Sequence, residues 1–262
     1  MVKILFLFCL FFLFSCHQRN KDVNAENTFV ELVGSEDGGN KEKYEKRSEV
    51  YVENVSELVP EDFVVFDEMY GDLNKDGIDD YVLIIKRTDS ENIVNDEYRG
   101  QLDRNRRGII IALKEEGRYK QVVCNPSCFS SENEDGGVYF APELSVYITG
   151  KGILMIHYSH GRYGYWEHLF RWQNNAFEMI GLTSHSNHGP VTLSINSINF
   201  STRRRQITTN TSDSWEVEDE KLEEAWEDIK NLPLINLNNI EDFDNINLSE
   251  YYKEQTSTNI KE

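Results

Sequence analysis

The sequence predicts a mainly β protein made of antiparallel sheets, arranged as a sandwich or a partial propeller-like structure, with one helix near the C-terminus. Short runs of β-branched and aromatic residues recur from residue 63 onward, and turn-forming residues separate them at close intervals. One segment, 219–231, has apolar residues at the spacing of a helix. With 262 residues and 39% hydrophobic content, the chain can form a packed core.

Residues 1–15 are expected to be a lipoprotein signal peptide. Lys3 supplies the positive charge, and an apolar run over 4–14 is shorter than the ~20 residues of a membrane-spanning helix. The small Ser15 followed by Cys16 resembles the lipobox of bacterial lipoproteins, which implies cleavage before Cys16 and lipidation of that residue. Two or three acyl chains would anchor the protein to a membrane of the cell envelope, at the periplasmic or surface face of the outer membrane. The alternative is a secreted protein cleaved elsewhere.

The remaining chain divides by composition into three parts. Residues 16–48 are polar without periodicity, which predicts a flexible tether. The β-rich domain is expected over 49–245, and 246–262 are expected to form a C-terminal tail. At the start of the domain, 49–58 predict a short helix that Pro60 ends.

Strand signals fill most of the predicted domain. Lys151 lies between two glycines and joins two strand-like runs, which is typical of a hairpin turn. Regular short spacing of this kind favours antiparallel pairing of neighbouring strands. Strands are expected over 63–66, 81–85, 108–113, 119–124, 144–149, 153–158, 165–172, 177–182, 191–195 and 206–209.

The predicted helix over 219–231 depends on three apolar residues. Leu222, Trp226 and Ile229 recur at spacings of four and three, and Pro233 follows the segment. We expect this helix to pack its apolar stripe on a sheet.

Residues 72–80 follow the pattern D-x-N-x-D-G-x-x-D, which is the start of a calcium loop. Alternate residues of a tight turn can point inward and supply the six or more oxygens that Ca²⁺ requires. Strand signals flank the loop, which argues against an EF-hand because that loop joins two helices. A structural ion that pins the turn is expected, with a regulatory or ligand-bridging ion as the alternative. The expected ligands are the side chains of Asp72, Asn74, Asp76 and Asp80 and the carbonyl of Ile78.

Two resemblances accompany these motifs. Residues 71–80 resemble the loop of FG-GAP and VCBS-type repeats, which often build β-propeller blades; this chain has a single copy, whereas a propeller needs its pattern at a fixed period. Over 55–245, the strings DRNRRG (103–108), SENEDGG (131–137) and HGRYGYW (160–166) resemble an uncharacterised family of Bacteroidetes envelope lipoproteins. That resemblance implies location and fold rather than an activity.

The segment 157–168 is the richest in side-chain chemistry, with three histidines within twelve residues. It lacks the H-E-x-x-H pattern of a zinc hydrolase. A hairpin with aromatic residues alternating between core and surface, a binding platform and a catalytic site are the three interpretations. The binding residues would be Arg162, Tyr163, Tyr165 and Trp166, and the catalytic residues would be His157, His160 and Glu167.

Cys124 and Cys128 are expected to form a disulfide, which an envelope location permits, or to remain two inert thiols. A redox role is disfavoured because the pair lacks C-x-x-C spacing.

The chain has 46 acidic and 27 basic residues and a net charge of −19. Such a protein repels phosphate backbones, so no nucleic-acid partner is expected. The G-x-S-x-G, Walker A and Rossmann patterns are absent from the sequence. We therefore predict a lipid-anchored, non-catalytic binding or accessory module for an envelope glycan or protein ligand, with structural Ca²⁺. The alternative is an envelope hydrolase acting on glycans or peptides.

Overall fold

Two antiparallel sheets organise the part of the chain that the computed structural model describes, residues 49–133 and 143–252. The expected signal peptide, Cys16 and the tether lie outside the described residues, as does most of the expected tail. The described residues belong to one unit spanning Arg47–Glu262.

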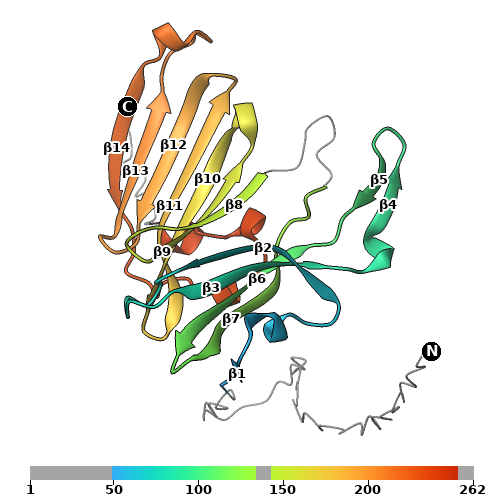
Figure 1. The fold of residues 1–262 in the computed structure, drawn as a ribbon. Helices are drawn as coiled ribbons and strands as arrows, with labels where there is room; N and C mark the ends of the chain where they lie inside the picture. Colours follow the sequence, from blue (N-terminus) through green and yellow to red (C-terminus); the bar gives the residue numbers. More distant parts are fainter. Residues whose placement is uncertain (1–48, 134–142, 253–262) are drawn as a thin grey trace, which may run out of the picture. The chain divides into compact units, whose positions relative to one another are not determined.

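The first sheet has five strands in the order β1-β7-β6-β3-β2, and every neighbouring pair is antiparallel (Figure 1). Its bounds are β1 Tyr51–Val52, β2 Phe63–Gly71, β3 Asp80–Arg87, β6 Arg107–Glu115 and β7 Arg118–Phe129. A separate two-stranded hairpin, β4 Ile93–Asp96 and β5 Gly100–Asp103, connects β3 to β6.

The second sheet has seven strands that pair in sequence order from β8 to β14. Figure 1 shows this sheet in yellow to orange, with the five-stranded sheet in blue to green. Its bounds are β8 Glu143–Ile148, β9 Ile153–Ser159, β10 Gly164–Gln173, β11 Ala176–His188, β12 Val191–Asn199, β13 Arg204–Asn210 and β14 Leu222–Asp228. The prediction of a mainly β protein with antiparallel sheets is confirmed.

Both sheets contribute to one main hydrophobic core. Val82 and Ile84 of β3 belong to the same buried cluster as Ile156 of β9 and Phe170 of β10. A smaller cluster lies on the opposite face of β3 and β6, where Leu83 is buried. The two central strands are therefore buried on both faces, which explains why they read as continuous apolar runs rather than as alternating ones.

Short 3-10 turns are the only helical elements among the described residues. They are η1 Val55–Leu58, η2 Ser90–Asn92, η3 Gly161–Tyr163, η4 Val217–Asp219, η5 Leu237–Asn239, η6 Phe243–Asn245 and η7 Ser249–Tyr251. The helix expected over 49–58 is replaced by β1 and η1. After β14, η5 to η7 place Leu237, Phe243 and Tyr251 in the main core.

The prediction of a helix over 219–231 is wrong. Residues Leu222–Asp228 form the edge strand β14, which pairs with β13 from Arg204↔Asp228 to Asn210↔Leu222. Leu222 and Trp226 are 46% and 53% exposed, while Ile229 is buried just beyond the strand. The open edge of β13 outweighs a weak helical pattern, because backbone pairing with that edge satisfies donors and acceptors that tertiary structure leaves unused.

Candidate functional site

The loop between β2 and β3 folds around the carboxylate of Asp72. Its Oδ1 accepts hydrogen bonds from the backbone N–H of Lys75 at 2.6 Å and of Asp76 at 3.1 Å, and its Oδ2 accepts one from Gly77 at 3.0 Å. Lys75 and Gly77 have positive φ values of 67° and 87°. The tight turn therefore exists because these backbone amides converge on one side chain.

The next two polar residues of the loop contact each other. Asn74 Nδ2 donates to Asp76 Oδ2 at 2.9 Å, and Asn74 Oδ1 accepts from the backbone N–H of Asp76 at 3.0 Å. Asp76 Oδ1 accepts from the backbone N–H of Ile78 at 2.8 Å. Asp72, Asn74 and Asp76 thus belong to one hydrogen-bonded turn, as the motif predicts.

Asp80 has a different role in the loop. It is fully buried, and its two oxygens accept hydrogen bonds from the backbone N–H groups of Leu73 and Lys114, each at 2.9 Å. Burial raises the pKa of this carboxyl, and the amide donors partly oppose that rise. Asp80 therefore fixes the loop to β6.

Calcium in this loop stays a prediction. Over 49–133 and 143–252, no three or more His, Cys, Asp or Glu side chains are grouped so as to hold a metal ion. Asn74 and the carbonyl of Ile78 are further oxygen donors of the turn, and Ca²⁺ accepts such ligands.

The loop packs directly on the turn between β8 and β9. At Gly152, which has φ +66°, an added Cβ would lie 2.7 Å from the carbonyl oxygen of Asp72 and 3.3 Å from that of Leu73. At Gly71, an added Cβ would lie 3.0 Å from Cγ2 of Ile148. Glycine at these positions allows an approach of the two sheets that a side chain would obstruct. We call residues 71–80 and 148–153 together the loop–turn junction.

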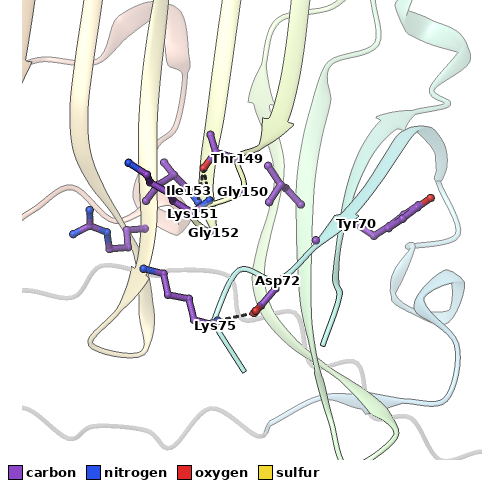
Figure 2. Close-up of a pocket in the computed structure, with 11 residues that line it drawn as sticks. Tyr70, Asp72, Lys75, Thr149, Gly150, Lys151, Gly152 and Ile153 are labelled. Carbon is purple, nitrogen blue, oxygen red and sulfur yellow. Dashed lines mark hydrogen bonds between the residues drawn. The ribbon is translucent and has the colours of Figure 1, made fainter. Parts of the chain in front are cut away.

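A cavity of about 540 Å³ lies at the loop–turn junction. In Figure 2, Lys75 extends from the loop toward the turn that carries Lys151, whereas the ring of Tyr70 points away from both. Three of the lining side chains are cationic, and they come from the loop, the turn and β10. The lining residues are Tyr70, Gly71, Asp72, Lys75, Ile148, Thr149, Gly150, Lys151, Gly152, Ile153 and Arg171.

The sequence analysis singled out two of the residues that line this cavity. It identified Asp72 as a ligand and Lys151 as the centre of a hairpin turn, but not as neighbours. Lys75 and Arg171 were missed. The proximity of Arg171 depends on its pairing with Ile153 across β9 and β10, which no local pattern encodes.

The histidine-rich segment forms the hairpin of β9 and β10, and strand alternation divides its side chains between two faces. His157 and Glu167 are paired across the strands, with His157 Nδ1 3.7 Å from Glu167 Oε2. The Tyr165 ring centroid lies 5.0 Å from that of His157 and 5.2 Å from that of His185 on β11. We call His157, Tyr165, Glu167 and His185 the outer-face row.

Trp166 and His168 face the main core instead. The Trp166 ring centroid is 4.1 Å from that of Tyr158 and 6.1 Å from that of Phe243. His168 is 3% exposed, and burial lowers its pKa to about 3. Tyr165 and Trp166 therefore lie on opposite faces and cannot form the single stacking platform predicted, because adjacent strand residues point in opposite directions.

The remaining predicted residues lie at the tip of the hairpin. The Arg162 guanidinium is 5.4 Å from the Tyr163 ring centroid in η3. Among the described residues, no hydrogen bond or ion pair joins His160 to His157 or Glu167. Burial raises the pKa of Asp244 in η6, and His160 partly opposes that effect. The structure thus joins two of the three proposed catalytic side chains.

The predicted disulfide is not present. Cys124 and Cys128 are both thiols on β7, the first exposed and the second buried. The pairing of β6 with β7 is irregular here: Asn125 pairs with Ile109 and Phe129 with Arg107, so three residues of β7 lie opposite one of β6. The Cys128 thiol donates to the carbonyl oxygen of Asn125 at 3.7 Å. Burial raises the pKa of Cys128, which suits the alternative of an inert thiol.

Comparison of the chain with protein-family models, with curated proteins and with solved structures gave no match. In the described ranges, no helix has both the length and the apolar character needed to cross a bilayer.

Proposed function

We propose that this protein is a lipid-anchored binding module of the cell envelope, and that its ligand occupies the cavity at the loop–turn junction. The observation that carries this proposal is the cavity itself. Its volume of about 540 Å³ falls within the range of small-molecule sites, and charged and polar groups from three elements converge on it. The envelope location and an envelope glycan or protein as ligand derive from the sequence.

A variant that fills the cavity tests this function. Gly150 lines the cavity, and a Cβ built there meets no atom within 4 Å. Gly150→Trp therefore adds a large side chain without backbone strain, and Gly150→Ala is the matched control. We expect fragments of purified envelope glycans to bind wild type and Gly150→Ala in calorimetric titrations, with binding lost in Gly150→Trp. Equal binding by the tryptophan variant would refute this site.

Calcium in the loop is the second part of the proposal, with Asp72 and Asp76 as its main charged ligands. At a free calcium concentration ten times the dissociation constant, binding stabilises the fold by about 1.4 kcal/mol. We expect wild type to melt at a higher temperature in millimolar calcium than in chelator, and Asp76→Ala to lose this increment. Asp72→Ala should also melt lower in chelator, because its carboxylate accepts three hydrogen bonds from the loop. A wild type indifferent to calcium would exclude the ion.

The lipid anchor is the third part, and it rests on Cys16, which lies outside the described residues. Cys16→Ala removes the acceptor of the lipid, so we expect the variant to leave the membrane pellet after fractionation. Retention of the variant in the pellet would contradict the anchor.

A further inference from the structure

We propose that the cavity at the loop–turn junction binds an oxyanion, a carboxylate or phosphate group carried by a small polar molecule. This inference rests on the proposed function, because it names the chemical class of ligand for the same cavity.

The fold assembles three cations around this cavity. Lys75 belongs to the loop, Lys151 to the β8–β9 turn and Arg171 to β10, and all three line the cavity. Within the described residues, none of them makes an ion pair within 4.0 Å. Three cations line the cavity against one carboxylate, that of Asp72, and a concave site with an excess of positive charge attracts anions.

Two carboxylates beside these cations, Asp72 and Glu178, accept hydrogen bonds from other groups. Asp72 also lines the cavity, but its oxygens accept three hydrogen bonds from loop amides. Glu178 is the cross-strand partner of Arg171 on β11. Its Oε2 accepts hydrogen bonds from Gln173 Nε2 at 2.6 Å and from Asn174 Nδ2 at 3.2 Å. The positive charge of the cavity is therefore not cancelled by direct pairing.

The Nε of Arg171 is buried and has no hydrogen-bond partner among the described residues. The Arg171 side chain therefore lines the cavity without being held by an internal acceptor at its Nε. Arginine offers a planar fork of donors that matches a carboxylate or a phosphate.

Some cations elsewhere in the chain are held by carboxylates. Lys86 Nζ lies 2.6 Å from both Asp103 Oδ2 and Glu132 Oε1. Arg205 Nη1 is 3.3 Å from Glu227 Oε2. In a chain of net charge −19, carboxylates are abundant. Lys75, Lys151 and Arg171 have no such partner within the described residues and line one cavity, so their combined charge there favours an anionic ligand.

The test is calorimetric titration of the folded domain with three probes: inorganic phosphate, galacturonate and galactose. The two sugars differ chiefly in the carboxylate. Lys151→Gln and Arg171→Gln each remove one cation from the cavity, and Lys75→Asn does so with a residue that tolerates the positive φ at this position. Lys221→Gln is the control, because this exposed lysine precedes β14 and does not line the cavity.

We expect at least one anionic probe to bind more tightly than galactose. Each cavity variant should weaken that binding by about tenfold or more, as expected when one charge-assisted hydrogen bond is lost, while Lys221→Gln leaves it unchanged. Binding of phosphate alone would indicate a phosphate-bearing ligand, and binding of galacturonate alone an acidic sugar.

Three outcomes would overturn the inference: galactose binding as tightly as both anionic probes, binding of neither anion, or an equal loss of anion binding in Lys221→Gln. If a neutral glycan fragment bound and Gly150→Trp abolished its binding, the proposed function would stand while this inference failed. Thermal unfolding of each variant shows whether it is folded.

Discussion

The loop–turn junction and the outer-face row were both candidate sites, and they are built in different ways. In the junction, backbone groups set the geometry: three amides converge on Asp72, and Gly152 lies against the carbonyls of the loop. In the outer-face row, side chains of β9, β10 and β11 meet because of strand register. The junction lines an open cavity, whereas the row brings together one histidine–carboxylate pair and rings in tilted contact.

This difference shows which kind of site local sequence can reveal. Residues 72–80 are contiguous, so the spacing of their polar residues and glycine is enough to predict the turn. The composition of 157–168 contains many reactive side chains, but it does not indicate that Trp166 and His168 turn inward. A dense run of histidines and aromatics on a hairpin is therefore weaker evidence for a site than a loop whose glycine and carboxylates have fixed positions.

The largest expected effect contrasts the two faces of the β9–β10 hairpin. Trp166→Ala removes a ring that packs against Tyr158 and Phe243, and should lower the free energy of unfolding by about 3 kcal/mol. Tyr165→Ala on the outer-face row should cost about 1 kcal/mol. Urea denaturation of both variants measures the difference. Equal losses would mean that the two faces are not distinct.

The next effect tests whether backbone contact holds the loop–turn junction. Gly152→Ala places a Cβ 2.7 Å from the carbonyl oxygen of Asp72 at a positive φ, and should destabilise the fold by about 2 kcal/mol. Gly150→Ala in the same turn meets no atom and should change stability by less than about 0.5 kcal/mol. Denaturant unfolding distinguishes them, and a neutral Gly152→Ala would show that the turn and the loop are not in close contact.

An effect of similar size, about 2 kcal/mol, is the pH dependence of stability that His168 causes on the buried side of the hairpin. Burial lowers the pKa of His168 to about 3, so the unfolded chain binds a proton near pH 6.5 that the folded protein does not. Stability should therefore fall as the pH decreases from 7 to 5, by about 2 kcal/mol from this residue alone. His168→Phe keeps an aromatic ring beside Trp166 and Phe243 and should remove this component. Unfolding curves of both proteins at both pH values measure this component. If the free energy of unfolding changed equally with pH in wild type and His168→Phe, the imidazole would be in contact with solvent.

Much of the fold could be predicted, and the failures have physical causes. Strands such as β3 and β6 were identified because β-branched runs pack well in a pleated, buried sheet. β14 was assigned as a helix because Leu222 and Trp226 are four residues apart, a spacing that also keeps two strand residues on one face. In place of the disulfide, β7 bulges between Asn125 and Phe129 and the Cys128 thiol donates to the carbonyl of Asn125, which the local sequence does not show.

Of the candidate site, the sequence predicted the loop over 72–80 but not the cavity beside it. Asp72, Asn74 and Asp76 belong to one turn because each hydrogen bond among them spans at most five residues of chain. The cavity beside that turn needs Lys151 and Arg171, which are distant in sequence and approach only when the two sheets pack.

The sequence by itself determined the β character, the strand–loop–strand motif and its turn, because these depend on residue conformation and on contacts between near neighbours. Tertiary structure decided that the last strand forms one edge of the seven-stranded sheet, that Trp166 and His168 face the main core, and that three cations line one cavity. These features depend on strand register and sheet packing, which bring together residues that are far apart in the sequence.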